Sequence, residues 1–403
     1  MKNPMRKFEL VIVGGGLTAA RAIKSYRESG GSGQIALLTA EGVLPYHRPA
    51  LSKRYLRGEV GAPFAEAETF YAEHGVEVLL GTPATSLDIR ARVVKTDAGD
   101  FRYAKLLLAP GSAPRWLDVT GSDRQEVYSL RTLEDSDHIR DAARTAERAV
   151  VVGGGFIGME AAASLRQLGL EVTLIHRGTG LFDQFGSADF SDELAAFYNE
   201  HGVEVMLGEE AASFAGDGRL EYVETKSGVC VAAEIAVVGV GVVPNVGFLA
   251  RSRLVLANGI VVNQRFETGA PDVYAAGDAA NFYDPLYRRR RRIEHWSNAN
   301  YQGTEVGKIL AEKRGGYDTV SSFFTEIFGT TIRVFGDVSR FDAVTTEGAL
   351  DSGFLASYGH EGKLVGALTV GQSDELEALV RELIAERAPM DALARELVSG
   401  RSE

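Results

Sequence analysis

Two stretches of this chain repeat one pattern: VIVGGGLTA at residues 11–19 and VVVGGGFIG at residues 150–158. In each, a run of β-branched apolar residues predicts a buried strand, the glycines predict a tight turn, and a helix is expected to follow. Such a turn brings backbone close to a pyrophosphate, which then lies at the positive end of the helix. One copy alone is weak evidence, because a chance match or a mononucleotide site gives the same pattern. Two copies predict two dinucleotides on one chain, and such chains usually move electrons between them.

The elements around the first turn fit a dinucleotide-binding unit. We expect a strand over residues 10–13, a helix to about Arg27 and a second strand over residues 34–38. An acidic residue at the end of that second strand would bind the adenosine ribose. Thr39 stands there instead and Glu41 is the nearest carboxylate, so this contact stays open. The residues of the two turns expected to bind the dinucleotides are Gly14, Gly15, Gly16, Leu17, Thr18 and Ala19 at the first, and Gly153, Gly155, Phe156, Ile157 and Gly158 at the second.

Length and composition favour a globular protein. The 403 residues, 45% hydrophobic and 24% charged, are enough for two or three domains with real cores. A net charge of −12 argues against a general nucleic-acid binder, which needs a basic surface. Only about nine residues precede the first expected strand, too few for a cleavable signal, and no run of 18 apolar residues could span a membrane. We therefore expect a cytoplasmic protein.

The chain contains one cysteine, Cys230, in a stretch that predicts a strand. We expect it to be a small buried apolar residue. A single thiol excludes an intramolecular disulfide and a CxxC centre. No metal site is predicted. Electrons that reach a bound redox cofactor must therefore leave directly for an external acceptor.

A third glycine motif is TGAPDVYAAGDAA at residues 268–280. A strand is expected to deliver Gly277 and Asp278 to the start of a helix. The glycine allows close backbone approach, and the carboxylate can accept hydrogen bonds from a sugar or polyol hydroxyl. An aspartate that only caps the helix is the alternative. Beside two dinucleotide-binding turns, we favour the ligand role for Asp278.

The order of these motifs resembles the FAD-dependent pyridine nucleotide-disulfide oxidoreductases of the glutathione-reductase type. Within them it resembles the branch of ferredoxin reductases, monodehydroascorbate reductases and apoptosis-inducing factor. The stretches that carry the resemblance are the first glycine turn, RPALSK at 48–53, GFIGME at 155–160, the Gly277-Asp278 segment and RIEHWSNA at 292–299. The resemblance implies an α/β, glutathione-reductase-like fold with two Rossmann-type dinucleotide-binding domains and a C-terminal α+β domain. The implied domains are 1–113 with 247–320 for FAD, 114–246 for NAD(P) and 321–403 for the C-terminal domain.

The resemblance also assigns residues to the cofactors. It places Arg48 and Lys53 on the flavin side and Asp278 at the ribitol chain. His295 and Trp296 would open a helix whose first amides stabilise negative charge at the flavin pyrimidine edge. Simple packing is the alternative for Trp296. The other positions implied at the cofactors are Ala84, through its backbone at the adenine, and Ala109, Gly111, Arg131, Gly241, Gly277 and Glu294.

Lys53 and Glu160 are the residues implied to be catalytic. In the family, the matching residues form an ion pair beside the flavin N5 and the nicotinamide, and both stand within their motifs here. Hydride transfer needs no proton donor, so the implied role is to orient the nicotinamide ring. An ordinary helix salt bridge is the alternative.

The nucleotide preference is predicted from the strand expected over residues 171–175. It ends at His176 and Arg177, where an NADH-specific site would place a carboxylate on the ribose 2′-hydroxyl. Cationic groups suit a 2′-phosphate, so we predict NADP(H) over NAD(H). A solvated arginine at a strand end is the alternative.

The chain departs from the ferredoxin reductases at the start of the last domain. They usually carry Pro-Tyr-Phe-Trp-Ser-Asp there, whereas this chain has SSFFTE at residues 321–326, with Phe324 in place of the tryptophan. Strands are expected over residues 331–335, 354–358 and 364–370. A packing or dimerisation helix is expected from the apolar stripe formed by Leu376, Leu379, Val380, Leu383 and Ile384.

The resemblance implies an FAD-dependent NAD(P)H oxidoreductase, in first place a ferredoxin reductase that passes electrons to a small iron–sulfur protein. The alternatives are a reductase of a small acceptor, such as a quinone or monodehydroascorbate, and a redox-controlled binding protein like apoptosis-inducing factor. Monomer and homodimer both stay open.

One charge run suggests where an acidic ferredoxin would dock. A chain with a net charge of −12 would repel such a partner unless a local positive patch reversed the field. Arg288, Arg289, Arg290 and Arg291 supply that patch, just before the helix implied to face the flavin. Arg292 is left out because its family position is beside the cofactor. A solvated loop with no partner is the alternative.

Overall fold

The computed structural model describes residues 5–400. The described chain falls into two compact units, which we call unit 1 and unit 2. Unit 1 comprises the described residues through His47 together with Ala62–Ala113 and Val243–Thr319. Unit 2 comprises Arg48–Gly61, Pro114–Val242 and the described residues from Val320 onward. Two of the points at which the chain crosses between the units lie within strands, in β7 (Ser112–Pro114) and in β16 (Val242–Pro244).

Unit 1 is built on one mixed sheet with the strand order β3-β2-β1-β6-β5-β4, and β18 pairs with β6. β1 lies between β2 and β6 and runs parallel to both, so the glycine turn after β1 lies at the carboxyl edge of the sheet. The elements of unit 1 are β1 (Arg6–Val13), α1 (Leu17–Glu28), β2 (Ile35–Leu38), α2 (Glu68–Glu73), β3 (Val76–Leu79), β4 (Ala84–Asp88), β5 (Val93–Thr96), β6 (Gly99–Leu108), η3 (Gly247–Leu249), β17 (Ile260–Val261), β18 (Val273–Ala275), β19 (Ala280–Asp284), β20 (Arg289–Arg291) and α6 (Trp296–Leu310).

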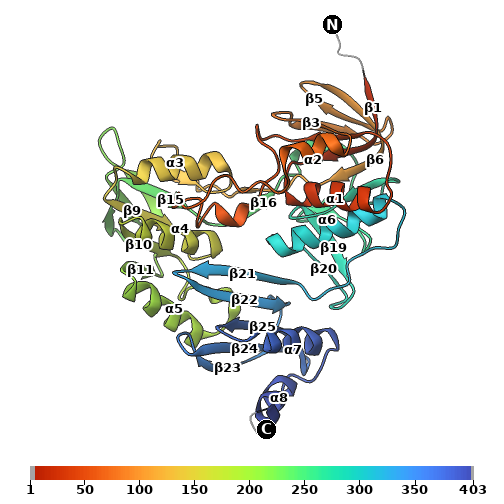
Figure 1. Cartoon of the computed structure of the whole chain (residues 1–403). Coiled ribbons are helices and arrows are strands. Elements are labelled where there is room, and N and C mark those ends of the chain that lie inside the picture. The colour runs from red at the N-terminus through yellow and green to blue at the C-terminus, as the bar shows by residue number, and fades with distance from the viewer. Residues whose placement is uncertain (1–4, 401–403) are drawn as a thin grey trace. The chain divides into compact units, whose positions relative to one another are not determined.

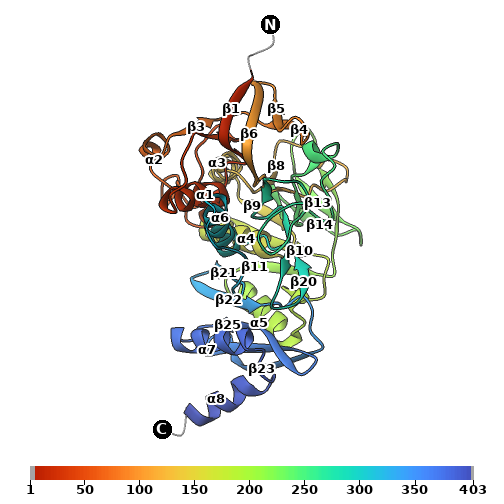
Figure 2. The same ribbon diagram turned by 90° about the vertical axis from the view of Figure 1, so that its right-hand side faces the viewer.

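Helices α1 and α6 of unit 1 lie side by side (Figures 1 and 2). Two glycines one helical turn apart on α6 permit this close approach. A Cβ added at Gly303 would lie 2.6 Å from the Thr18 carbonyl oxygen, and one added at Gly307 would lie 2.6 Å from that of Ala22. Both distances are too short for real Cβ atoms, so the backbones pack closely only because these residues are glycines. This packing fixes the start of α6 relative to the first glycine turn.

Unit 2 contains a second parallel sheet, with the strand order β11-β10-β9-β15-β8. A three-stranded antiparallel sheet, β12-β13-β14, belongs to the same unit. The elements of this part are η1 (Arg48–Ala50), β8 (Val127–Ser129), α3 (Leu133–Ala143), β9 (Arg148–Val152), α4 (Phe156–Gln167), β10 (Glu171–His176), η2 (Asp183–Phe185), α5 (Ala188–Glu200), β11 (Val203–Leu207), β12 (Ala211–Ala215), β13 (Tyr222–Thr225), β14 (Cys230–Ala232) and β15 (Ile235–Val238). The β9–turn–α4 segment therefore repeats the β1–turn–α1 segment of unit 1.

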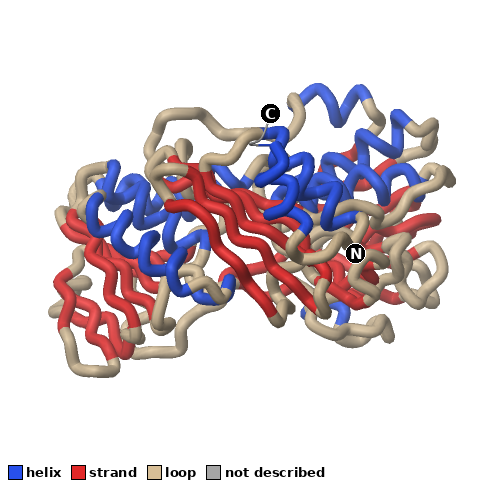
Figure 3. The backbone as a smooth tube through the Cα atoms, turned by 90° about the horizontal axis from the view of Figure 1, so that it is seen from below, coloured by secondary structure: helices blue, strands red, loops and turns tan. Residues whose placement is uncertain are grey.

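The last part of unit 2 is a five-stranded antiparallel sheet, β21-β22-β25-β24-β23, with helices beside it (Figure 3). Its elements are β21 (Ser322–Ile327), β22 (Thr330–Gly336), β23 (Ala343–Ala349), β24 (Gly353–His360), β25 (Lys363–Val370), α7 (Asp374–Ala385) and α8 (Ala392–Gly400). The three strands and the helix expected here are confirmed. On α7, Val380 and Ile384 are fully buried, whereas the three leucines of the stripe are only partly covered.

The helix expected after Asp278 is wrong. A turn leads from Asp278 straight into β19, whose residues alternate between buried and more exposed positions as in a strand. β19 pairs with β17 on one side and β20 on the other, and these ladders satisfy its backbone. Asp278 therefore caps no helix.

Two further local expectations are wrong. Residues 48–53 start no α-helix: they form η1 and a series of turns, in which the Leu51 and Lys53 amides bond three residues back, to Arg48 and Ala50. Cys230 does lie in a strand, but it is exposed, because β14 is an edge strand of its sheet.

Within residues 5–400, no helix is long and apolar enough to cross a membrane. The same described residues contain no group of three or more histidine, cysteine or acidic side chains placed to hold a metal ion.

Candidate functional site

The first glycine turn has the shape of a cradle for a ligand. Gly14 has φ +115°, and an added Cβ would lie 1.9 Å from the Ala109 carbonyl oxygen, so only glycine fits there. An added Cβ at Gly16, in contrast, would meet nothing within 4 Å. Gly16 therefore faces open space at the start of α1, as the pyrophosphate interpretation requires.

Some helices of this chain begin with a side-chain cap, whereas α1, α2, α4 and α6 begin without one. α3, α5 and α7 begin with side-chain caps, from Thr132, Ser187 and Ser373 respectively. α1 and α4 begin at Gly16 and Gly155, neither of which has a side chain to bond the first amides. A helix start that lacks a side-chain cap and carries the positive dipole end attracts an anion. The two glycine turns thus fit a bound pyrophosphate.

Around the first turn, unit 1 brings together three motifs that the sequence analysis assigned to FAD. The Thr18 hydroxyl donates to the Ala299 carbonyl of α6 over 3.2 Å. A Cβ added at Gly277 would lie 2.5 Å from the Thr18 hydroxyl, so the third motif packs directly on α1. The buried Gln302 side chain of α6 accepts from the Gly277 amide over 2.8 Å. The glycine turn, the Gly277 segment and the start of α6 therefore form one site.

Arg292 joins two of the predicted FAD residues. Its guanidinium donates to the Asp278 carbonyl oxygen over 3.2 Å and forms an ion pair with Glu294. The Glu294 carboxylate also lies 3.5 Å from the Ser112 hydroxyl. Arg292 thus belongs to this site, as the sequence analysis expected when it left this residue out of the docking patch.

The start of α6 is held by a contact that sequence reasoning missed. The Trp296 indole donates to Nδ1 of His47 over 2.8 Å. Burial, with a further contribution from the Arg21 charge, lowers the pKa of His47, which keeps that ring neutral and able to accept. His47 stands between Pro45 and Arg48 in a quoted motif, yet nothing in the sequence pairs it with a residue 249 positions away. Trp296 is therefore oriented by a polar contact as well as by packing.

The remaining predicted FAD residues of unit 1 lie at its sheet edge. The Glu41 carboxylate accepts from the Tyr46 hydroxyl over 2.5 Å. The Thr82 amide donates to the Thr39 carbonyl over 2.7 Å, which places the chain leading to Ala84 beside the end of β2. The Gly111 carbonyl accepts from the Asn245 amide over 2.9 Å. Ala109 borders the first turn, as described above.

Unit 2 contains Arg48 and Lys53, which were predicted for the flavin side, and Arg131, which was predicted at the cofactors. The Arg48 guanidinium donates to the Arg131 carbonyl oxygen over 2.6 Å, so these two are neighbours. Lys53 follows five residues later and pairs with Glu160, as described below. Their assignment to FAD stays a prediction.

The second glycine turn follows the first closely. Gly153 has φ +116°, and an added Cβ would lie 2.4 Å from the Gly239 carbonyl oxygen. Gly155, like Gly16, faces open space. A Cβ at Gly158 would lie 1.9 Å from the Gly153 carbonyl oxygen, so glycine at this third position keeps α4 close to β9. Ala19 is tolerated at the matching place in the first copy, where it is fully buried.

Phe156 and Ile157 begin α4 directly after this turn, and Gly241 is a further position predicted at the cofactors. The Phe156 ring packs on Phe182 and Phe323, whereas Ile157 is 39% exposed. The Gly241 carbonyl accepts from the Arg115 amide over 2.8 Å, and Gly241 has φ +104°.

His176 does not behave as the cation that the sequence analysis expected. Its Nδ1 accepts from the Gly154 amide over 3.1 Å, which requires an unprotonated nitrogen. Burial lowers the pKa of His176, with Asp183 opposing the shift and Arg177 adding to it. The ring is therefore neutral at neutral pH and supports the glycine turn. Arg177 is exposed at the end of β10, and no ion pair holds it within residues 5–400.

The ion pair predicted between Lys53 and Glu160 is present: Nζ and Oε1 lie 2.8 Å apart. Both residues are buried, with exposed fractions of 8% and 5%. Two hydroxyls that the sequence analysis did not single out also donate to the Glu160 carboxylate. Ser52 bonds Oε2, and Thr325 of β21 bonds Oε1 over 2.7 Å. Glu160 is thus a buried carboxylate surrounded by donors, which suits an anchor better than a proton donor.

Some arginines of the run at residues 288–291 form contacts within the protein. Arg291 pairs with the buried Asp284 at 2.8 Å and lies over the Tyr287 ring. Arg290 donates to the carbonyl oxygens of Val262 and Asn281. Arg288 is exposed at the turn before β20, and Arg290 is exposed within it. Arg291 is therefore a structural residue, whereas Arg288 and Arg290 have exposed side chains.

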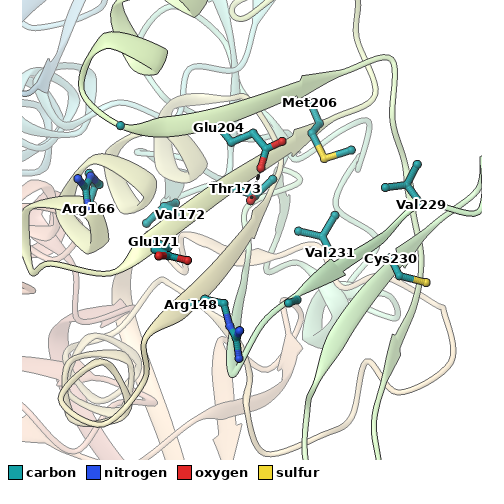
Figure 4. A pocket seen from close by; sticks show the side chains of 12 residues that line it. Arg148, Arg166, Glu171, Val172, Thr173, Glu204, Met206, Val229, Cys230 and Val231 are labelled. Carbon is teal, nitrogen blue, oxygen red and sulfur yellow. Dashed lines mark hydrogen bonds between the residues drawn. The ribbon is translucent and has the colours of Figure 1, made fainter.

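Unit 2 also contains a pocket of about 460 Å³ beside β10, β11 and β14 (Figure 4). None of its lining residues was predicted to bind a cofactor. Its two arginines are already bonded, Arg148 to Glu234 and Arg166 to the carbonyl oxygens of Leu170 and His201. The lining residues are Arg148, Arg166, Glu171, Val172, Thr173, Gly202, Glu204, Met206, Val229, Cys230, Val231 and Ala232.

The start of α6 predicts a pH dependence. Burial lowers the pKa of His295 to about 4, from an ordinary value near 6.5. Between these values the unfolded chain binds a proton that the folded chain does not, so stability rises with pH. The contribution of His295 is complete above pH 6.5 and is lost as the pH falls toward 4. Denaturant unfolding of the apoprotein should therefore show a smaller loss of stability over this interval for His295→Gln than for the wild type. Parallel pH curves for the two proteins would contradict the assignment.

Comparisons with known proteins agree with this geometry. The family model described as pyridine nucleotide-disulphide oxidoreductase matches residues 8–303. Apoptosis-inducing factor 3 of Homo sapiens is 33% identical over 383 residues, which cover 93% of this chain and 63% of that protein's length. Monodehydroascorbate reductase of Pisum sativum is 32% identical over 431 residues, covering 98% of this chain and 99% of that one.

The crystal structure of a ferredoxin reductase from Rhodopseudomonas palustris is also similar to this chain. It has a TM-score of 0.90 at 29% identity, and the match covers 96% of each chain. These similarities confirm the implied fold class, and the chain belongs to the pyridine nucleotide-disulphide oxidoreductase family.

Proposed function

We propose that this protein takes electrons from NADPH through FAD and passes them to a small ferredoxin-type iron–sulfur protein. The observation that carries the proposal is the pair of glycine turns with open helix starts, at Gly16 and at Gly155. The similarity to a ferredoxin reductase over nearly the whole chain supports the choice of acceptor. The three-domain division at residues 113, 246 and 320 is part of this proposal.

FAD, when bound, supplies the chemistry, because it takes up a hydride and can release electrons one at a time. The protein contributes binding and orientation. The first glycine turn and the start of α6 would hold the FAD pyrophosphate and pyrimidine edge. Lys53 and Glu160 would hold the nicotinamide ring within stacking range of the flavin ring, roughly 3–3.5 Å. Glu160 keeps its charge paired while it does so.

FAD binding should depend on Gly16 in a specific way. Gly16 has an extended backbone that any residue adopts, and an added side chain would enter open space instead of protein. We expect Gly16→Val to fold normally but to bind FAD roughly tenfold or more weakly, because the side chain takes the place of the pyrophosphate. The flavin absorbance of the purified protein and a fluorescence titration of the apoprotein measure this.

The matched control for Gly16→Val is Gly42→Val, at an exposed glycine that also has nothing near its Cβ position. It should leave FAD binding unchanged. A Gly16→Val protein that retains wild-type FAD affinity would refute the pyrophosphate assignment.

The preference for NADPH rests on Arg177 alone, since His176 is neutral and occupied by the Gly154 amide. The exposed Arg177 guanidinium follows the carboxyl end of β10, where we expect the adenosine ribose of the second dinucleotide to bind. No carboxylate follows β10 directly. A 2′-phosphate is the group that such a cation recognises.

Arg177→Ala should lower kcat/KM for NADPH about tenfold, the effect of one charge-assisted hydrogen bond, and should change the value for NADH little. Steady-state reduction of ferricyanide with each nucleotide measures the two values. Arg219→Ala, at another exposed arginine of unit 2, should alter neither. If the wild type prefers NADH and Arg177→Ala leaves both values unchanged, the NADPH assignment is wrong.

The proposed docking patch is reduced to Arg288, Arg289 and Arg290, because Arg291 pairs with a buried aspartate. An acidic ferredoxin approaching a chain of net charge −12 needs such a local cationic surface. The steering would weaken as salt screens it over a Debye length of about 8 Å at physiological ionic strength.

Charge reversal at Arg288 and Arg290 together should slow electron transfer to an acidic ferredoxin several-fold at low salt and less at high salt. NADPH-to-ferricyanide activity should stay intact. The control Arg144→Glu reverses an exposed arginine at the C-cap of α3 and should have no effect on either rate.

Equal loss or equal retention of both activities would contradict docking at this patch. It would favour the second candidate, a reductase of a small acceptor. The similarity to the pea monodehydroascorbate reductase, which extends over both whole chains, supports that candidate. A screen of quinones, ascorbyl radical and ferredoxins with the reduced protein separates the two. A protein that is reduced only slowly and then changes its association state would instead behave like a redox-controlled binding protein.

A further inference from the structure

The C-terminal sheet reaches the buried carboxylate of Glu160 through one strand. Successive side chains of β21 alternate in environment: Phe324 is 44% exposed, whereas its neighbours are covered. Phe323 meets the Phe156 ring edge-on at 5.2 Å, and Thr325 is completely buried. Phe156 opens α4, so β21 packs on the helix that starts at the second glycine turn.

The hydroxyl of Thr325 is one of three donors that surround Glu160. Lys53 Nζ and Thr325 Oγ1 share Oε1, at 2.8 and 2.7 Å, and Ser52 bonds Oε2. A lysine ammonium is a flexible point charge and does not fix the plane of a carboxylate. Two hydroxyls on opposite oxygens do fix it, because each is carried by a short side chain on packed backbone.

We propose that Thr325 is a positioning residue for reduction by the nicotinamide dinucleotide. Its hydroxyl holds the Glu160 carboxylate in the orientation in which Oε1 pairs with Lys53. The C-terminal domain thereby completes the site in unit 2, and it does so from the strand that exposes Phe324. This inference rests on the proposed function, because it assigns Thr325 a role through Glu160.

The test compares Thr325→Val with Thr325→Ser. Valine keeps the shape of threonine and removes the hydroxyl, whereas serine keeps the hydroxyl. We expect the limiting rate of flavin reduction at saturating NADPH to fall about tenfold in Thr325→Val, because one hydrogen bond to a charged group is lost. The rate should recover in Thr325→Ser. The FAD content should not change. Anaerobic rapid mixing over a range of NADPH concentrations separates the limiting rate from nucleotide affinity.

A matched control is Thr369→Val. Thr369 is a buried strand threonine of the same sheet, and its hydroxyl lies 3.5 Å from Glu377, which Arg333 also holds. This change removes a buried hydroxyl without touching Glu160 and should leave the reduction rate at the wild-type value.

A double-mutant cycle shows whether Thr325 acts through Glu160. In a Glu160→Ala background, Thr325→Val should cause no further slowing. The same cycle on denaturant unfolding of the apoprotein gives a measure that does not depend on activity, and the two changes should be non-additive there as well. Additive effects in both measurements would overturn the proposal.

The outcomes also separate this inference from the proposed function. A wild-type protein reduced by neither NADPH nor NADH would contradict the proposed function, and with it the role of Thr325. A wild type that is reduced normally, with Thr325→Val reduced equally fast, would contradict the positioning role alone.

Discussion

The constraint on which the site depends is the close approach of backbone to backbone at the two glycine turns. At Gly14 and Gly153 a side chain would run into a carbonyl oxygen of a neighbouring strand connection, Ala109 in one case and Gly239 in the other. Because the backbones lie this close together, each helix begins immediately after its strand ends. The helix then starts without a side-chain cap, facing open space at Gly16 and Gly155. A positive helix end without a side-chain cap is stabilised when water or an anion meets its first amides.

A second set of close contacts determines what else stands at the first turn. The glycines of α6 allow that helix to lie on α1, and Thr18 then touches both α6 and the Gly277 segment. Small residues at these contacts bring three motifs that are far apart in the sequence into one site. In unit 2, polar contacts have the same effect: Ser52, Lys53 and Thr325 converge on one buried carboxylate, so their positions depend on each other.

Sequence reasoning predicted the parts of this protein that follow from local rules. The strand–turn–helix repeats and the C-terminal strands follow from apolar periodicity and glycine placement, and the structure confirms them. The start of α6 at Trp296 was implied by the family resemblance and is also confirmed. The ion pair of Lys53 with Glu160 was implied by a family resemblance and is present.

The helix expected after Asp278 was wrong because strand pairing with β17 and β20 outweighed a local cap signal. Cys230 was expected inside because strand propensity does not tell an edge strand from a central one. Partners such as His47 and Thr325 could not be predicted, because only the folded chain brings them to residues more than 160 positions away.

The central claim is that each glycine turn binds the pyrophosphate of a different dinucleotide. Amide hydrogen exchange, measured at the starts of α1 and α4, tests it most directly. The account predicts that FAD added to the apoprotein slows exchange at Leu17 and Thr18, and that NADPH added afterwards slows exchange at Phe156 and Ile157. Protection of the same turn by both dinucleotides, or of neither turn by either one, would contradict it.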